Sequence, residues 1–362
     1  MIRSASVARF GVEEEFVLLD EQTLVPSAMT PETRERILDA AGAGLTPEYL
    51  TCQLESATEP CVTRADAEGQ LRRTRGILGE VAAKQGSIVA ASGTPFISPN
   101  RLVVSSSPHY DAVSAQLVEI TREHEVNGLH IHVEVLDEEE RVRVVNRVRA
   151  WLPPLLAITG NAPFAHGRDS GYASWRSILI RRLPASWSPP LFHDLSDYRS
   201  HVDQLVSMGA IAEASSLSWT VRLSERFPTV EVRVFDAQLT VDDTLLAVAL
   251  TRALLVSDAL DDCHGLSLDA IDASLWTAAR YGTDARLVDP VNGSIEPAWT
   301  IADRLLERLR PALSQLGDDD FVVDGLARLR SEGTGAQRQH RAYADDGAAG
   351  LRELYRTSTA TR

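Results

Sequence analysis

The chain has 362 residues, of which 44% are hydrophobic and 24% are charged. This composition is typical of a globular protein and excludes a disordered or fibrous chain. The formal net charge of −15 argues against a general nucleic-acid binder, because neutralising phosphates requires a concentrated surplus of Lys and Arg. An anionic substrate would therefore need a local basic pocket.

In the first third of the chain, the pattern of side chains predicts two strands and two helices. In chain order the elements are a strand (Phe10–Asp20), a helix with Thr30 as its cap (Thr30–Ala41), an extended segment (Tyr49–Val62), a helix (Arg64–Gln85) and a strand (Ser87–Ala91). The strands follow from alternating side chains and the helices from apolar residues at helical spacing. A loop rich in Ser, Gly and Pro follows, at residues 92–108.

The rest of the chain continues this mixture of strands and helices. The predicted elements are a strand (Gly128–Leu136), a helix (Glu138–Thr159) that Pro153 and Pro154 must kink or interrupt, a strand (Val230–Phe235) and an apolar helix (Val241–Val256). Helices dominate from residue 284 onward, and the last residues, Thr357–Arg362, should fray. Because no shift in composition marks a boundary, we expect a single α+β domain over residues 1–362.

The sequence also bears on where the protein resides. No run of about 18 apolar residues predicts a membrane helix, and the start, MIRSASVARFGVEEEF, lacks the apolar segment of a signal peptide. Cys52, Cys61 and Cys263 form neither a CxxC pair nor an even disulfide framework. We therefore expect a cytoplasmic protein with reduced thiols, without membrane association and without cysteine-bound zinc.

Three consecutive acidic residues, Glu13, Glu14 and Glu15, stand in the first predicted strand. Charged residues on the solvated face of an edge strand are common, and this is the simplest interpretation of such a triplet. The flanking residues are apolar on both faces, however, which indicates a covered strand in which neighbouring carboxylates need a cation. Glu13 and Glu15 share one face, and carboxylates on alternate residues suit Mg²⁺.

The strand within GLHIHVEVL places His130, His132 and Glu134 on one face. The two histidines could be ordinary hydrogen-bonded residues, members of a metal site, or the zinc ligands of a hydrolase. Glu134 could be a further ligand, but it stands near the strand end, where a solvated side chain is the simpler expectation.

Glu231 and Arg233 alternate within VEVRVF. A cross-strand salt bridge is the common meaning of such a pair. A covered strand instead favours a site in which the carboxylate holds metal and the guanidinium binds phosphate. Glu55, in QLESATEP, is a single acid in an extended segment, and it becomes informative only if other acids converge on it.

A basic group, Arg176, Arg181 and Arg182, stands beside Tyr172 and Trp175. These cations could line a solvated helix face, or they could supply the local positive charge that an acidic protein needs to bind a carboxylate or phosphate. The Gly-rich stretches match neither the Walker pattern nor GxGxxG, and no Ser nucleophile elbow is found. Nucleotide binding by those folds is therefore not supported.

Together these segments resemble the carboxylate–amine ligase family related to bacterial glutamate–cysteine ligases, also called YbdK-like or glutamate–cysteine ligase type 2. The resemblance runs from about Gly11 to about Tyr343. Its motifs in chain order are GVEEEF, QLESATEPC, AASGT, GLHIHVEV, GRDSGYASWRS, PTVEVRVFD with VDD, and WTAARYG. Several ordered motifs together are far more specific than any one of them.

The resemblance implies a curved, mainly antiparallel sheet with helices packed on its outer face, as in glutamine synthetases and guanidino kinases. The sheet's concave face would hold the site. By motif, Glu13 and Glu15 match the metal-binding acids of the first strand. Glu55 matches a further metal-binding or catalytic acid, and His130 matches the metal position of a Gly-x-His motif.

The remaining site residues also follow from the resemblance. Glu231 and Arg233 match the Glu-x-Arg pair, as metal ligand and catalytic phosphate contact respectively. His132, Tyr172 and Arg176 are expected to contact the substrate or ATP.

Three positions depart from the family pattern. Glu134 stands where Gly is common, the SGT loop lacks a following His, and Thr277 stands where an Arg is usual. If that Arg contacts nucleotide or the acid substrate, its replacement bears on full activity or on the usual substrate.

The activity implied by the resemblance is ATP-dependent amide formation. A glutamate-like carboxylate would be activated as an acyl phosphate and joined to an amine, with ATP as co-substrate and Mg²⁺ or Mn²⁺ as cofactor. The partners would be amino acid and amine substrates, and the protein could be a homo-oligomer. Two alternatives stay open: a metal-dependent hydrolase that uses the HxH pair, and a degenerate ATP- or metabolite-binding protein without turnover.

Overall fold

The computed structural model describes residues 8–41, 44–98, 103–105, 107–260 and 265–359. Its main sheet is antiparallel throughout and has the strand order β10-β11-β5-β1-β3-β2, with β4 also paired to β1. The strands of this sheet are β1 (Phe10–Asp20), β2 (Leu45–Pro47), β3 (Gln53–Ala57), β4 (Ser87–Ala90), β5 (Gly128–Glu134), β10 (Val221–Leu223) and β11 (Thr229–Asp236). Three short strand pairs lie outside it: β6 (Phe164–Ala165) with β7 (Arg168–Asp169), β8 (Ser186–Trp187) with β9 (Ser218–Trp219), and β12 (Arg286–Val288) with β13 (Ile295–Pro297).

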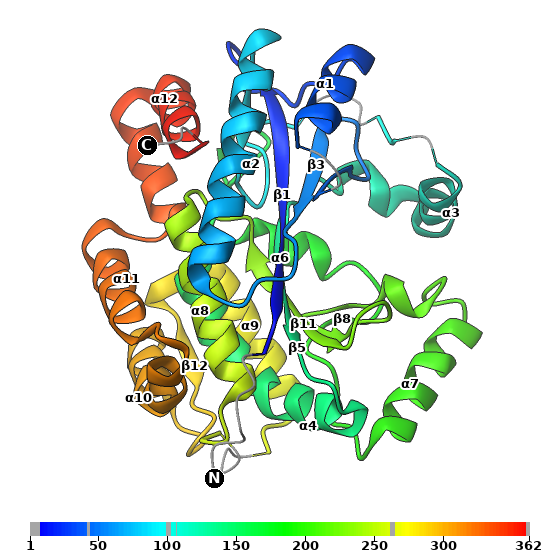
Figure 1. Ribbon diagram of the computed structural model, residues 1–362, viewed down its shortest axis with the longest axis vertical. Helices are drawn as coiled ribbons and strands as arrows, with labels where there is room; N and C mark the ends of the chain where they lie inside the picture. The colour runs from blue at the N-terminus through cyan, green and yellow to red at the C-terminus, as the bar shows by residue number, and fades with distance from the viewer. Residues whose placement is uncertain (1–7, 42–43, 99–102, 106, 261–264, 360–362) are drawn as a thin grey trace.

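Helices make up most of the remaining chain. The α-helices are α1 (Pro31–Ala41), α2 (Arg64–Lys84), α3 (Pro108–Leu117), α4 (Glu138–Val148), α5 (Leu152–Thr159), α6 (Trp175–Ile180), α7 (Leu195–Ser207), α8 (Val241–Val256), α9 (Leu268–Tyr281), α10 (Ala298–Leu316), α11 (Asp319–Glu332) and α12 (Gly335–Thr359). Figure 1 shows β1 along the middle of the molecule, with α10, α11 and α12 on one side and α3 and α7 on the other. The α+β class and the mainly antiparallel sheet are therefore confirmed.

The strand β1 is buried on both faces along much of its length. Phe16 and Leu18 on one face belong to a buried cluster with residues of α1 and α2. Val17 and Leu19 on the other face belong to a cluster with residues of α12. The acidic residues of β1 come just before these apolar ones, so they enter the interior of the protein and do not lie on a solvated edge.

Glu14 lies on the helix-covered face of β1 and is paired with Arg75 of α2. Arg75 donates from Nη2 to Oε1 at 2.5 Å and from Nε to Oε2 at 3.1 Å, and Thr244 of α8 donates to Oε1 at 2.6 Å. The side chains of Glu14 and Arg75 are both 2% exposed. A buried carboxylate held by a two-point guanidinium contact has its charge satisfied, so Glu14 joins the sheet to two helices.

Several predicted element bounds are found as expected. The strand Phe10–Asp20 and the helix Val241–Val256 have the predicted ends. The interruption expected within 138–159 is present, but it lies before the prolines: α4 ends at Val148, a 3-10 turn (Arg149–Trp151) follows, and α5 begins at Leu152. Pro is favourable in a first helical turn, because the N–H that it lacks would have no intrahelical partner there.

The last described residues at the C-terminal end belong to a helix. The helix α12 continues to Thr359, whose side chain is buried and donates a hydrogen bond to the Tyr355 carbonyl at 3.3 Å. The helix thus includes residues 357–359, residues 360–362 lie outside the described part, and fraying of 357–362 stays a prediction. The single domain over 1–362 stays a prediction.

Two further expectations concern the cysteines and membrane-spanning helices, and the structure bears on each only in part. Cys52 and Cys61 are buried free thiols, and Cys263 lies outside the described residues. Among the helices described, none combines the length and the apolar character needed to cross a membrane.

Candidate active site

Cross-strand pairing places six of the predicted site residues opposite one another on one face of the main sheet. The facing pairs are Glu13 with His130, Glu15 with Glu55, and Glu231 with His132. Directly opposed residues in an antiparallel pair have Cβ atoms about 5 Å apart. The convergence of acids that the sequence alone could not establish is therefore present.

Glu13 lies between the two histidines of β5. Its Oε2 is 3.2 Å from His130 Nδ1, and its Oε1 is 3.3 Å from His132 Nε2. Burial by itself would raise the pKa of Glu13, but hydrogen bonds from His130 and His132 hold that pKa well below its usual range. Burial and the charge of Arg233 lower the pKa of His130. Glu13 is therefore an ionised carboxylate at neutral pH.

Glu231 is held by two arginines. Arg222 donates from Nε to Oε2 at 2.7 Å and from Nη2 to Oε1 at 3.3 Å, and Arg233 Nη1 also donates to Oε1. Burial would raise the pKa of Glu231, but the charges of Arg233 and Arg222 hold it well below its usual range. The sequence reasoning missed Arg222, which stands directly opposite Glu231 on β10.

Arg233 leaves the regular register of β11. The pairing of β11 with β5 shifts between Val232 and Phe235, and the Arg233 N–H donates instead to the Thr220 carbonyl at 2.8 Å. Irregularities of this kind re-aim a side chain next to a site. The guanidinium lies 3.3 Å from His130 Nδ1 and also lines a cavity, so it can contact a ligand held beside the acids.

Two further carboxylates crowd this face. Burial together with the charges of Glu13, Glu48 and Glu15 raises the pKa of Glu55 to about 9. Burial together with the charge of Glu15 raises the pKa of Glu48 to about 7. Carboxylates that lie close together take up protons unless a cation balances them. The sequence reasoning missed Glu48, which follows β2 and carries no motif of its own.

The donor set fits divalent cations. Ligand atoms of Glu13, Glu55 and His130 lie within 4.8 Å of one another, and so do those of Glu13, His132 and Glu231. The Nε2 atom of His130 is buried and lacks a hydrogen-bond partner among the described residues, and the buried Nε2 of His132 has Glu13 Oε1 3.3 Å away. Each set combines two carboxylates with one imidazole, a set that suits Mg²⁺ or Mn²⁺ better than a zinc site built on both histidines.

Glu15, also expected to bind metal, belongs to neither set. Its Oε2 accepts a hydrogen bond from the Gly128 N–H at 2.6 Å, and its Oε1 is 3.8 Å from His130 Nε2. Its side chain lines the adjoining cavity. Its role as a metal ligand therefore stays a proposal.

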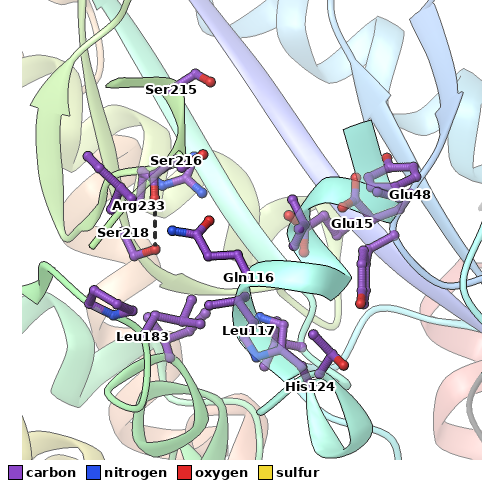
Figure 2. A pocket seen from close by; sticks show the side chains of 18 of the residues that line it. Glu15, Glu48, Gln116, Leu117, His124, Leu183, Ser215, Ser216, Ser218 and Arg233 are labelled. Carbon is purple, nitrogen blue, oxygen red and sulfur yellow. Dashed lines mark hydrogen bonds between the residues drawn. The ribbon is translucent and has the colours of Figure 1, made fainter. Parts of the chain in front are cut away.

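A cavity of about 260 Å³ adjoins the acids. Figure 2 shows Glu15 and Glu48 on one side of it and Arg233 on the other. His130 also lines the cavity, so the space opens directly beside the set of Glu13, Glu55 and His130. A small substrate held there would lie next to a cation bound by that set.

Arg176 of α6 also lines this cavity, as expected of a substrate contact. Its side chain is buried, its Nη1 lies 3.9 Å from Asp236 Oδ1, and its Nε has no hydrogen-bond partner. The two Asp236 oxygens accept hydrogen bonds from the Asn161 N–H at 2.7 Å and the Ser174 hydroxyl at 2.8 Å. Asp236 is therefore only a distant partner for the Arg176 cation.

Tyr172 is not among the residues that line this cavity. Its ring packs 5.2 Å from the Trp175 ring and 6.2 Å from the Trp276 ring, with the Arg280 guanidinium 5.2 Å from its centre. The structure therefore does not support the expected substrate contact by Tyr172 in this cavity. Thr277, on the same helix as Trp276, donates its hydroxyl hydrogen bonds to backbone carbonyls.

The other charged candidates do not reach the site. Arg181 pairs with Asp272 at 3.2 Å, and Arg182 pairs with Glu123 at 3.1 Å. Of the basic group noted in the sequence, Arg176 is thus the member that lines the cavity. Glu134 forms an ion pair with Arg9 at 3.0 Å.

The sequence matches a known family over nearly its whole length. Residues 9–357 match the profile of glutamate–cysteine ligase family 2. A relative from Mycobacterium sp. (strain KMS), provisionally named glutamate–cysteine ligase 2-2, is 38% identical over 339 residues, which cover 92% of this chain and 93% of the relative. A relative from Saccharopolyspora erythraea with the same provisional name is 39% identical over 354 residues, which cover 95% of this chain and 90% of the relative.

Solved structures show the same fold at low sequence identity. A glutamate–cysteine ligase from Francisella tularensis, in complex with AMP, matches with a TM-score of 0.75 and 14% identity, over 97% of this chain and 88% of that chain. The family match covers the strands that carry Glu13, Glu55, His130 and Glu231. The chain belongs to glutamate–cysteine ligase family 2.

Proposed function

We propose that this chain is an ATP-dependent carboxylate–amine ligase that forms an amide through an acyl phosphate and has glutamate–cysteine ligase-like activity. The observation that carries the proposal is the convergence of Glu13, Glu55, Glu231 and Arg233 on one face of the sheet. Membership of the family and a shared fold with an AMP-bound ligase support it.

The acids would hold the metal. Glu13, Glu55 and His130 form one ligand set, and Glu13, His132 and Glu231 form the other, so that Glu13 would bridge both. Bound Mg²⁺ or Mn²⁺ would neutralise the phosphates of ATP and the charge that develops during phosphoryl transfer. Arg222 and Arg233 keep Glu231 ionised and oriented for this role.

The first step would activate the carboxylate. An oxygen of the substrate carboxylate attacks the γ-phosphorus of ATP, the bond from that phosphorus to the β–γ bridging oxygen breaks, and ADP leaves. Arg233 lies at the border of the acids and the cavity, so its N–H groups can donate to the transferring phosphoryl oxygens.

The second step would form the amide. The amine nitrogen attacks the acyl carbon, a C–N bond forms, and inorganic phosphate leaves with the electrons of the C–O bond. The amine must lose a proton in this step. Glu48 lines the cavity beside Glu15 and is placed to accept it.

Measuring ADP release tests the proposal. The purified protein with ATP and Mg²⁺ should release ADP with glutamate and at least one amine, and mass spectrometry should detect the amide. Arg233→Lys should lower turnover by roughly 10²-fold or more, because a point charge cannot reproduce the two-pronged guanidinium contact. Arg199→Gln, which removes an exposed pair with Glu138, should keep wild-type turnover.

Each alternative predicts a different result. A hydrolase that uses His130 and His132 would contain zinc and act without ATP. A degenerate binding protein would bind ATP tightly and release no ADP with any pair of acid and amine. Either result would overturn the ligase proposal. A cytoplasmic location and a homo-oligomeric state stay predictions.

A further inference from the structure

The cavity beside the acids has three chemically distinct parts. Glu15 and Glu48 supply negative charge on one side. Arg176 supplies a buried positive charge. Apolar side chains from α3, α6 and the segments after α6 and α7 form a third part, chiefly Val113, Leu117, Ile180, Leu183, Pro184 and Ile211. Arg233 and polar side chains, among them Gln116, His124, Ser215, Ser216 and Ser218, line the remainder.

Arg176 is a buried cation with spare hydrogen-bond donors. Its side chain is 5% exposed, its Nε has no partner, and its contact to Asp236 is 3.9 Å long. Both Asp236 oxygens accept hydrogen bonds from other groups, so Asp236 leaves most of the Arg176 donors free. A buried guanidinium in this state favours an anionic ligand, and a carboxylate matches its geometry.

Gly128 leaves room for this arrangement. A Cβ at position 128 would lie 2.5 Å from Arg176 Nη2 and 3.0 Å from His130 Nε2. Arg176 therefore lies close to His130, a member of one predicted ligand set, and a ligand bound to Arg176 would lie beside that set.

We propose that this cavity binds the amine substrate, and that this substrate is an α-amino acid with an apolar side chain. Its carboxylate contacts Arg176, and its amino group faces Glu48. Its side chain packs against Leu117, Ile180 and Leu183. This inference rests on the proposed ligase function and adds to it the class of the amine.

Other occupants match the three parts of the cavity less well. An adenine ring would suit the apolar wall, but it carries neither a carboxylate for Arg176 nor a cation for Glu48. A second acidic amino acid would place its side-chain carboxylate against Leu117, Ile180 and Leu183, which costs free energy because none of these side chains can donate a hydrogen bond to it.

Steady-state kinetics with matched amines test the inference. Glutamate, ATP and Mg²⁺ are supplied with leucine, with serine, or with 3-methylbutylamine, which is leucine without its carboxylate. The KM for leucine should be about 10-fold to 100-fold below that of either other amine, which is the range for one charged hydrogen-bonded contact or one buried apolar side chain. Equal KM values for the three amines would overturn the proposal.

Variants of Arg176 and Leu183 test which part of the amine substrate each side chain contacts. Arg176→Gln should raise the KM for leucine about 10-fold to 100-fold and leave the KM for 3-methylbutylamine and for ATP unchanged. Leu183→Asn should reduce the preference for leucine over serine. Arg199→Gln serves as the surface control. An increase in the KM for ATP in Arg176→Gln would instead assign Arg176 to the nucleotide and overturn the proposal.

A binding measurement separates this inference from the ligase function. Leucine at millimolar concentration should raise the Tm of the wild-type protein, whereas 3-methylbutylamine should not, and Arg176→Lys should retain part of the shift that Arg176→Gln loses. If no pair of substrates releases ADP but leucine still raises the Tm, the ligase function fails and the amino acid site stands. If ADP is released with every amine alike and leucine leaves the Tm unchanged, only this inference fails.

Discussion

Glu13 of β1 lies directly opposite His130 of β5, with its Oε2 3.2 Å from the histidine Nδ1. Glu13 is the member common to both predicted ligand sets. Hydrogen bonds from its neighbouring histidines hold the pKa of Glu13 well below its usual range, so Glu13 offers a metal ion a charged carboxylate. Removing this one carboxylate should therefore disable both sets together.

Glu13→Gln should lower kcat/KM by about 10²-fold to 10³-fold, because a neutral amide replaces the shared ligand. Calorimetric titration with Mg²⁺ in the presence of an ATP analogue should show weakened metal binding. Glu134→Gln, on the same face at the end of β5, is the matched control and should keep wild-type values, since Glu134 pairs with Arg9. Wild-type turnover in Glu13→Gln would contradict the site.

The stability of the metal-free protein should fall as pH rises. The pKa of Glu55 is raised from its ordinary value of 4.5 to about 9, and that of Glu48 to about 7. Between pH 4.5 and 9 these two carboxyl groups therefore hold more protons in the folded protein than in the unfolded chain. Their contribution to the free energy of unfolding is greatest at low pH and is lost as pH rises through this window. Urea denaturation at pH 6 and pH 9 in EDTA should show the loss.

Glu55→Gln should remove most of the fall above pH 8, because a glutamine has no proton to lose and Glu48, with a pKa of about 7, is mostly ionised by then. Saturating Mg²⁺ should reduce the fall in the wild-type protein, since metal binds the ionised carboxylates. An unchanged dependence on pH in Glu55→Gln would show that Glu55 is not the crowded group.

The alternation within β1 and β5 made part of the site predictable from sequence. Side chains in a strand repeat every two residues, so Glu13 and Glu15 had to share a face that Glu14 does not share. The structure bears out this separation, since Glu14 pairs with Arg75 on the helix side. A strand pattern thus predicts which side chains point together along one strand.

Contacts between strands could not be predicted in the same way. Arg222 reaches Glu231 because β10 pairs with β11 in one particular register, and the alternation within β11 alone does not show which residue of β10 lies opposite Glu231. Glu48 joins the acids because of the turn between β2 and β3. Tyr172 packs against Trp276 and does not line the cavity, so its predicted contact with substrate or ATP stays a prediction.

Glu14→Gln should destabilise the protein by about 3–5 kcal/mol, because it leaves the buried guanidinium of Arg75 without its counter-charge. Urea denaturation measures the loss. Glu32→Gln is the control, since it breaks an exposed pair with Arg36 in a helix and should cost about 0.5 kcal/mol or less. Similar losses in the two variants would show that the Glu14 pair does not stabilise the junction of sheet and helices.

Gly128→Ala should impair activity more than it impairs folding. The added Cβ would lie 2.5 Å from Arg176 Nη2 and 3.0 Å from His130 Nε2, so the guanidinium or the imidazole must move. Overpacking of a buried site typically costs about 1–3 kcal/mol. The displaced groups are the ones that would contact the amine substrate and the metal, so kcat/KM should fall by at least 10-fold, a factor that corresponds to about 1.4 kcal/mol.

Gly69→Ala provides the matched control for this substitution. Gly69 lies in α2, where an added Cβ meets nothing within 4 Å. Because Ala loses less backbone entropy than Gly when a helix forms, this variant should gain about 0.5–1 kcal/mol of stability and keep wild-type kinetics. If Gly128→Ala matched Gly69→Ala in kcat/KM and Tm, the side chains of Arg176 and His130 would have room to move away from the added methyl group. Their positions would then not depend on the absence of a side chain at Gly128.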